Sequence, residues 1–199
     1  VVPKAAKHDS PDYYMNKAQT IANETPNSFF TAQYTNPANP EIHYKTTGPE
    51  IWDATDGKIT HFVAALGTGG TITGTAKFLK EKNHKIKLVG IDPEGSIFYE
   101  YFKNRRLIKP HRYSLEGLGD EFLLPTVQLD LLDDMIQVND KTAFEWSLKL
   151  AREEGIIAGG SSGANIYGAI KLARQIDAPA DIVTIFPDSG YKYASSIYA

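Results

Sequence analysis

Short continuous runs of apolar residues alternate with helical hydrophobic periodicity along most of this chain. The runs occupy residues 59–66, 85–91, 134–138 and 181–186. Helical patterns occupy a stretch that reaches Leu79, then residues 140–154 and residues 164–175. Short apolar runs bounded by turn residues are typical of strands buried in a parallel sheet. The alternation therefore predicts an α/β fold with an open, mostly parallel twisted sheet and flanking helices.

The beginning of the chain and one central stretch are less regular. Residues 11–24 predict a helix with Ser10 as its cap. Aromatic and β-favouring residues at 28–34 predict a strand, and residues 41–54 predict a second helix. Proline and glycine are spread through residues 92–125, which we therefore expect to be rich in loops, either functional or plain surface excursions.

A Gly-Thr-Gly-Gly-Thr segment at residues 67–71 follows the predicted strand that ends at Leu66. A strand, a glycine loop and a helix start form an anion site, because glycine lets the backbone approach a ligand and the helix N-terminus presents free N–H groups. NAD is disfavoured because Ile72 stands where the dinucleotide fingerprint requires glycine, and the Gly-Lys-Ser/Thr ending of an ATP-type loop is absent. The segment predicts a phosphate-bearing ligand, with a tight turn that binds nothing as the alternative.

A second glycine and serine loop, residues 159–163, precedes the helix predicted from Ala164. In an open α/β sheet, ligands bind beyond the carboxyl ends of the strands, so we expect the two loops to converge on one crevice. Ser161 and Ser162 offer neutral hydroxyls that donate or accept a hydrogen bond. A ligand with a phosphate at one end and a ring nitrogen at the other would use both loops.

Composition restricts the class of protein. The chain has 199 residues, 42% of them hydrophobic and 23% charged, which suits a globular domain with a sizeable core. A net charge of −3 without a long basic run argues against nucleic acid as a partner, and no apolar run is long enough to span a membrane. The lack of cysteine excludes disulfides and thiolate chemistry, and the cytoplasm is the expected location. No metal is expected, because the five histidines show no metal-ligand spacing.

Several motifs together resemble the fold-type II pyridoxal-phosphate enzymes, in particular the cystathionine β-synthase and cysteine synthase family. The motifs run over nearly the whole chain: Asp9-Ser10-Pro11, Gln33-Tyr34, Asn36-Pro37-Ala38-Asn39-Pro40, the loop from Gly67 to Gly74, Asp92-Pro93-Glu94-Gly95-Ser96, Glu116-Gly117-Leu118-Gly119, Gly159-Gly160-Ser161-Ser162-Gly163 and Pro187-Asp188-Ser189-Gly190. The resemblance implies a tryptophan-synthase-β-like fold. It also implies that residues 1–44 end a smaller N-terminal α/β domain and that residues 45–199 form the larger cofactor-binding domain.

The resemblance assigns roles to individual residues. The implied cofactor is pyridoxal 5'-phosphate, and Ser161 matches the serine that hydrogen-bonds its pyridine nitrogen in the family. The cofactor phosphate is matched by Gly67, Thr68, Gly69, Gly70 and Thr71. Gln33 matches a glutamine near the substrate carboxylate, and Gly117 and Gly119 match a loop that lines the amino-acid site. The lysine that forms the Schiff base in this family has no match, and the chain resembles the C-terminal two-thirds of a catalytic core.

The activity implied is β-replacement on serine or O-acetylserine, by elimination followed by thiol addition. Homocysteine as the thiol would give cystathionine, as in transsulfuration, whereas sulfide would give cysteine, which is the cysteine synthase alternative. A second alternative is a non-catalytic fragment that binds the cofactor reversibly, because the Schiff-base lysine is unmatched. The resemblance also implies small amino-acid substrates and a homodimer. Asp120 and Glu121 depart from the aromatic residue that many eukaryotic members carry after Gly119, which bears on substrate preference.

Overall fold

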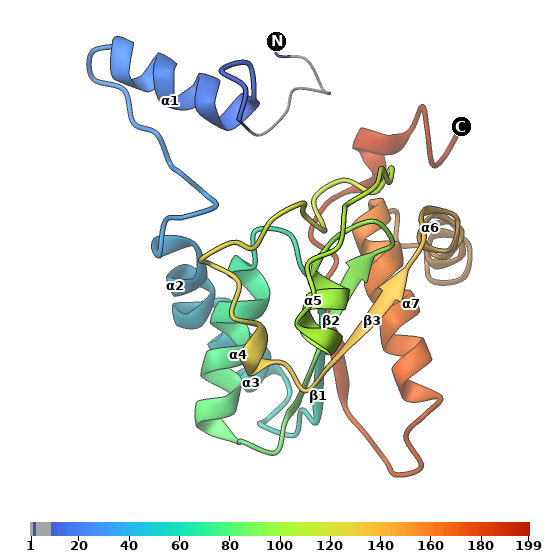
Figure 1. Cartoon of the computed structure of the whole chain (residues 1–199). Coiled ribbons are helices and arrows are strands. Elements are labelled where there is room, and N and C mark those ends of the chain that lie inside the picture. Colours follow the sequence, from blue (N-terminus) through green and yellow to red (C-terminus); the bar gives the residue numbers. More distant parts are fainter. Residues whose placement is uncertain (1, 3–8) are drawn as a thin grey trace. The chain divides into compact units, whose positions relative to one another are not determined.

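The computed structural model describes residue 2 and residues 9–199, and its contacts divide the chain into two compact units. The first unit is Val1–Asn36 and the second is Pro37–Ala199. Figure 1 shows the elements in chain order. The predicted domain division at residue 44 stays a prediction.

The first unit contains helix α1, Tyr14–Glu24, which confirms the predicted helix. Its start lies later than predicted, and no side chain caps it: the Ser10 hydroxyl instead accepts a hydrogen bond from the Asp12 amide, 3.1 Å away. The predicted strand at 28–34 is wrong, since those residues form irregular and turn structure, with Phe29 80% exposed and Ala32 at φ 48°. An isolated extended segment gains no ladder hydrogen bonds, and the described part of this unit offers it no neighbouring strand.

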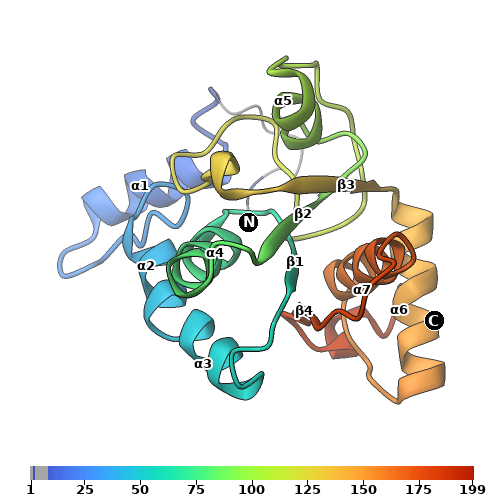
Figure 2. The same ribbon diagram turned by 90° about the horizontal axis from the view of Figure 1, so that it is seen from below.

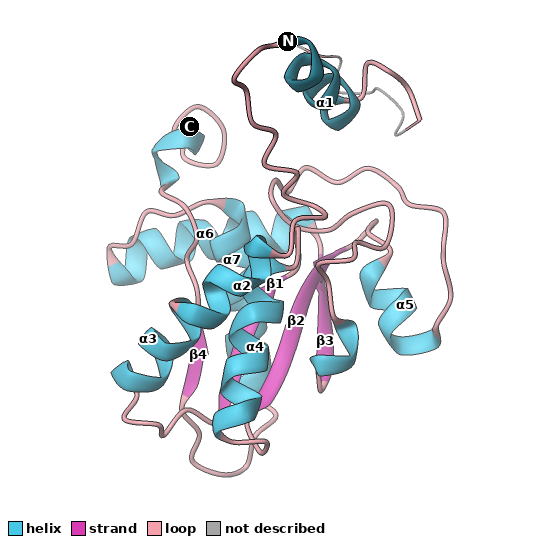
Figure 3. Ribbon diagram, turned by 90° about the vertical axis from the view of Figure 1, so that its left-hand side faces the viewer, coloured by secondary structure: helices cyan, strands magenta, loops and turns pink. Residues whose placement is uncertain are grey.

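The second unit is built on a four-stranded parallel sheet of order β3-β2-β1-β4. Its strands are β1, His61–Ala65, β2, Lys87–Pro93, β3, Asp134–Val138, and β4, Ile182–Thr184. In register, Val63 is opposite Val89 on β2 and Thr184 on β4. The four apolar runs of the sequence are therefore the four strands, which lie side by side in Figure 3 and confirm the predicted open parallel sheet.

Helices cover both faces of this sheet (Figure 2). On one face lie α2, Ala38–Lys45, α3, Thr47–Ala54, and α4, Gly70–Lys82. On the other lie α6, Asp140–Glu154, and α7, Gly160–Ala173. Helix α6 is capped by Asn139, whose side chain accepts a hydrogen bond from the Thr142 amide at 2.9 Å, and its C-terminal cap is Gly155, with φ 70°.

The single helix predicted over residues 41–54 is two helices, α2 and α3, separated at Thr46. Pro49 explains the break, because a proline has no N–H to donate to the carbonyl of Lys45 and its ring crowds that carbonyl. The predicted loop-rich region also contains a helix, α5, Phe98–Asn104, which packs near β3. A short 3-10 helix at Leu129–Leu131 and another at Gly190–Tyr193 were likewise not predicted.

One cluster of buried hydrophobic residues lies between the sheet and α7. It contains Val63, Val89, Ile91, Ile136 and Val138 from the strands, together with Ala164 and Ala169 from α7. A β-carbon added at Gly168 would collide with the Ile91 side chain, so α7 packs closely against β2 because residue 168 is glycine. This packing fixes the N-terminus of α7 relative to the carboxyl ends of the strands.

Candidate functional site

The segment 67–71 joins β1 to α4 at the carboxyl end of the sheet. Gly69, the residue before the helix, has φ 79°, a left-handed conformation that favours glycine, and no side chain caps α4. The first N–H groups of a helix have no acceptor within the helix, and the helix dipole places partial positive charge at the same end. An uncapped α4 N-terminus therefore suits an anionic ligand.

Two glycines of this loop are required by close neighbours. A β-carbon at Gly67 would collide with the backbone oxygen of Gly117, and one at Gly70 would collide with the side-chain amide of Asn39. Any larger residue would displace the loop from Gly117 or from Asn39. The glycine-rich sequence is thus explained by packing as well as by access to a ligand.

The two threonines of the loop are held by residues from α2. The Asn39 amide donates to the Thr68 hydroxyl at 2.9 Å, which leaves the Thr68 hydroxyl hydrogen able to point to a ligand. Nε2 of His43 lies 3.2 Å from the Thr71 hydroxyl, and its Nδ1 lies 2.9 Å from the Thr47 hydroxyl. Burial lowers the pKa of His43, so its ring is neutral at pH 7.

A separate segment, residues 126–128, supports the loop from behind. The Thr126 hydroxyl donates to the Thr68 carbonyl at 2.6 Å, and the backbone N–H of Gln128 donates to the Thr73 hydroxyl at 3.1 Å. Between them, Val127 fills the space that a β-carbon at Gly69 would need. These supports, like Asn39 and His43, were missed by sequence reasoning, because residues far apart in sequence carry no local signal of contact.

The second predicted loop is the first turn of α7. The helix begins at Gly160, not at Ala164 as predicted, and no side chain caps it. The loop is fixed on both sides: the Gly159 amide donates to Asp188 at 3.2 Å, and the Ser147 hydroxyl donates to the Gly159 carbonyl at 3.0 Å. Asp188 follows β4, the parallel neighbour of β1, so both glycine loops lie at the carboxyl edge of the sheet.

Ser161 and Ser162 differ in what they offer a ligand. The Ser162 hydroxyl is completely buried and has no hydrogen-bond partner among the described residues. Ser161 is 6% exposed, and its side chain likewise makes no hydrogen bond within the part of the chain that the structure describes. Because it retains accessible surface, Ser161 is the serine that suits a ligand group approaching the N-terminus of α7.

The predicted substrate loop touches both glycine loops. The Gly119 amide donates to the Leu66 carbonyl at 2.5 Å, and the Gly117 oxygen packs against Gly67. On the other side, the Leu115 side chain packs against Gly160. Gly117 and Gly119 have φ 80° and 73°, so both occupy left-handed conformations. The structure thus brings the predicted cofactor and substrate loops together, whereas Gln33 lies in the first unit.

Two ionisable groups near this edge, Asp92 and Tyr113, have shifted pKa values. Asp92, near the end of β2, is fully buried; its Oδ2 accepts from the Tyr99 amide at 2.9 Å, and its Oδ1 has no partner among the described residues. Burial raises the pKa of Asp92 to about 7. Burial, with the nearby carboxylates of Asp120 and Asp92, also raises the pKa of Tyr113, which therefore stays neutral.

The residues present fit a ligand that carries a phosphate and a ring nitrogen. Two uncapped helix N-termini lie at one sheet edge, the Thr68 hydroxyl hydrogen is available for donation, and Ser161 has no partner among the described residues. This combination suits a phosphate-bearing cofactor bound at the carboxyl edge of an α/β sheet. The chain belongs to the pyridoxal-phosphate dependent enzyme family, whose model matches residues 2–188.

Within this family, the similar proteins are cystathionine β-synthases and cysteine synthases. The O-acetylserine dependent cystathionine beta-synthase of Bacillus subtilis is 41% identical over 91% of this chain and 57% of its own length. Cysteine synthase A of Escherichia coli is 39% identical over 92% of this chain and 58% of its own length. The crystal structure of the O-acetylserine dependent cystathionine beta-synthase from Helicobacter pylori superposes with a TM-score of 0.84 at 35% identity, over 93% of this chain and 58% of that one.

The chain therefore spans less than two thirds of the length of these relatives. The family and the relatives confirm a fold-type II enzyme related to cystathionine β-synthase and cysteine synthase, with pyridoxal phosphate as the family's cofactor. No described helix is both long and apolar enough to cross a membrane.

Proposed function

We propose that the protein catalyses pyridoxal-phosphate-dependent β-replacement on serine or O-acetylserine, with homocysteine as the thiol and cystathionine as the product. The proposal is supported by the family and by relatives that are named cystathionine beta-synthase or cysteine synthase. The observation that carries it is the pair of uncapped helices at the carboxyl edge of the sheet, α4 with Thr68 and α7 with Ser161.

The α4 N-terminus would hold the cofactor phosphate in this proposal. The residues are Gly67, Thr68, Gly69, Gly70 and Thr71, whose backbone N–H groups and two hydroxyls supply donors. Asn39 orients the Thr68 hydroxyl by donating to its oxygen. His43 does the same for Thr71 when its Nε2 carries the hydrogen, because the Thr71 hydroxyl then accepts from the ring and donates to the phosphate.

Ser161 would hydrogen-bond the pyridine nitrogen. When bound, the cofactor supplies an electron sink for the bond that breaks at the substrate α-carbon. A serine hydroxyl is a weaker partner for that nitrogen than a carboxylate, so the nitrogen stays largely unprotonated and the sink is milder. A milder sink suits loss and replacement of a β-substituent.

Gly117 and Gly119 would line the amino-acid site, and Gln33 in the first unit stays a predicted substrate-binding residue. The two glycines have left-handed backbone conformations that other residues rarely adopt, and the Gly117 oxygen contacts Gly67 of the 67–71 loop, which supports this part of the proposal. In this proposal the Schiff-base lysine lies outside the sequence described, and the protein works as a cytoplasmic homodimer.

The sulfur donor is the point on which the main proposal and its alternative differ. Incubation of the full-length protein with pyridoxal phosphate, O-acetylserine or serine, and an equimolar mixture of homocysteine and sulfide tests it directly. Mass spectrometry is expected to find cystathionine as the main product. Cysteine as the main product would support the cysteine synthase alternative. Reversible cofactor binding without a borohydride-trapped lysine adduct, and without either product, would support the non-catalytic alternative.

A further inference from the structure

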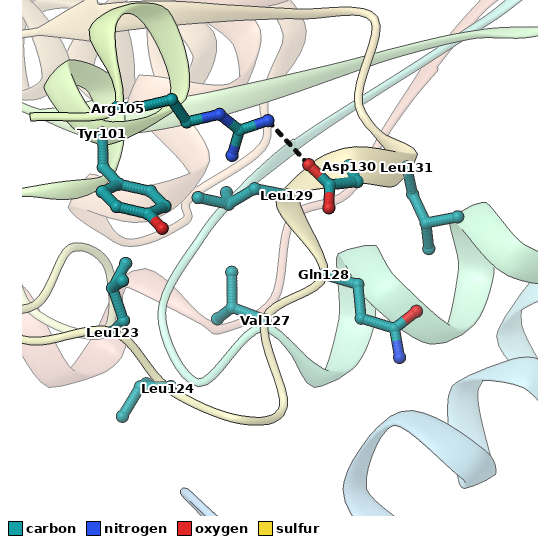
Figure 4. Close-up of a pocket in the computed structure, with 9 residues that line it drawn as sticks. All are labelled: Tyr101, Arg105, Leu123, Leu124, Val127, Gln128, Leu129, Asp130 and Leu131. Carbon is teal, nitrogen blue, oxygen red and sulfur yellow. Dashed lines mark hydrogen bonds and ion pairs between the residues drawn. The ribbon is translucent and has the colours of Figure 1, made fainter.

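A cavity of about 430 Å³ lies in the second unit between α5 and the segment 123–131 (Figure 4). Its volume is within the range of small-molecule sites. The aliphatic side chains that line it are Leu123, Leu124, Val127, Leu129 and Leu131. Leu124 and Leu129 are 5% and 6% exposed, whereas Leu123 is 39% exposed, so the cavity has a buried apolar floor and an accessible rim.

One cation stands at this rim. Arg105, the C-terminal cap of α5, places its guanidinium 5.6 Å from the centre of the Tyr101 ring and 2.7 Å from the Asp130 carboxylate. Figure 4 shows the guanidinium extending toward Asp130, with the ion pair drawn as a dashed line. The Arg105 and Asp130 side chains are 59% and 87% exposed, and an ion pair so exposed to water contributes little to stability.

We propose that this cavity is a binding site for an amphipathic monoanion, an aliphatic molecule that carries one carboxylate. The aliphatic part would contact the leucine floor, and the carboxylate would replace Asp130 as the partner of Arg105. A guanidinium group can bind a carboxylate through two parallel hydrogen bonds. A ligand carboxylate could bind Arg105 in this way, whereas Asp130 forms a single exposed ion pair with it. Asp130 is exposed and returns to water when displaced.

The cavity wall is also the support of the glycine loop. Val127 faces the cavity and fills the space beside Gly69, while its neighbours Thr126 and Gln128 bond Thr68 and Thr73. A ligand that shifts Val127 must also shift the contact with Gly69. A ligand that moves Val127 would therefore change the affinity of the α4 N-terminus for phosphate. This coupling rests on the proposed cofactor site, whereas ligand binding to the cavity does not.

Calorimetric titration of octanoate into the full-length protein tests whether the cavity binds it. Arg105→Met removes the charge and keeps the side-chain length, and Arg106→Met is the matched control, because Arg106 is exposed and pairs with Glu100 outside the cavity. Wild type and Arg106→Met are expected to bind octanoate saturably, and Arg105→Met is expected to bind it about tenfold more weakly. Wild type is likewise expected to bind octan-1-ol, which lacks the carboxylate, about tenfold more weakly than octanoate. Leu123→Trp, which fills the rim of the cavity, is expected to abolish binding.

Absence of saturable binding by wild type would overturn the site, and so would equal affinities of Arg105→Met and Arg106→Met. The coupling has its own readout: the dissociation constant of pyridoxal phosphate with and without saturating octanoate. A change is expected in wild type and none in Leu123→Trp. An unchanged constant in wild type would overturn the coupling, and failure to bind pyridoxal phosphate at all would count against the proposed function while leaving the octanoate result interpretable.

Discussion

Nε2 of His43 lies 3.2 Å from the hydroxyl oxygen of Thr71, at the N-terminus of α4. Nδ1 of the same ring lies 2.9 Å from the Thr47 hydroxyl, so the ring joins two hydroxyl groups. A neutral imidazole has one N–H, and only the Nε2–H form leaves the Thr71 hydroxyl hydrogen free for an anion. Binding of a phosphate is therefore expected to select that tautomer, with Thr47 donating to Nδ1.

Substitution of His43 tests this arrangement. His43→Ala leaves Thr71 without its partner and is expected to weaken pyridoxal phosphate binding about three- to tenfold, as expected for one neutral hydrogen bond. His43→Gln supplies an amide donor and is expected to stay within about twofold of wild type. Cofactor titration measures both. Equal losses in the two variants would show that ring packing, rather than the hydrogen bond, is what matters.

The contact between Gly67 and Gly117 predicts a second result. Gly67→Ala places a β-carbon against the Gly117 oxygen and is expected to lower cofactor affinity, because the loop must move away from its neighbour. Gly155→Ala is the control: its φ of 70° costs about 1 kcal/mol of stability, but no residue beyond its chain neighbours lies within 4 Å of the added carbon. Gly155→Ala should lower the melting temperature and leave cofactor affinity unchanged. A Gly67→Ala protein with wild-type affinity would contradict the account.

Ser161 and Ser162 form a matched pair. Ser161→Ala is expected to change the absorption spectrum of the bound cofactor and to lower the rate of β-replacement, since a partner of the pyridine nitrogen is lost. Ser162→Ala removes a buried hydroxyl that has no hydrogen-bond partner among the described residues, so it is expected to be neutral or stabilising. Spectra and initial rates of both variants decide the assignment. If Ser162→Ala alone changed the spectrum, the pyridine partner would be Ser162.

Asp92 predicts a pH dependence of stability. The pKa of its carboxyl is about 7 in the fold and 3.8 without the fold around it, so between these values the folded state binds a proton that the unfolded state has released. Its contribution therefore favours folding at low pH and is lost as pH rises through this window. As pH rises from 4 to 8, the free energy of unfolding of Asp92→Asn is expected to increase relative to that of wild type by up to about 4 kcal/mol. Denaturant titrations measure the difference, and a difference independent of pH would contradict the raised pKa.

The sheet and its glycine loops were predictable because their signals are local. Each strand is a short apolar run, and the 67–71 segment carries its own glycines. Pro49 also marks the break between α2 and α3, although the hydrophobic pattern obscured it. Helix α5 was missed because its turn-rich surroundings hide one short helix.

The rest of the site depends on contacts between distant residues. Thr126 and Thr68 are separated by 58 positions, and Asn39 and Thr68 by 29. Nothing in the local sequence of residues 126–128 indicates that they contact the glycine loop. Conversely, residues 28–34 have strand-favouring composition, but a strand forms only beside another strand, which depends on the fold around it.

The most direct test of the central claim is the affinity of the full-length protein for pyridoxal phosphate and for pyridoxal, which lacks the phosphate. Thr68→Val keeps the shape of the side chain and removes its hydroxyl. If the α4 N-terminus holds the phosphate, the variant should bind pyridoxal phosphate about tenfold more weakly and pyridoxal as wild type does. An equal loss for the two ligands, or no loss for either, would show that the glycine loop does not bind the phosphate.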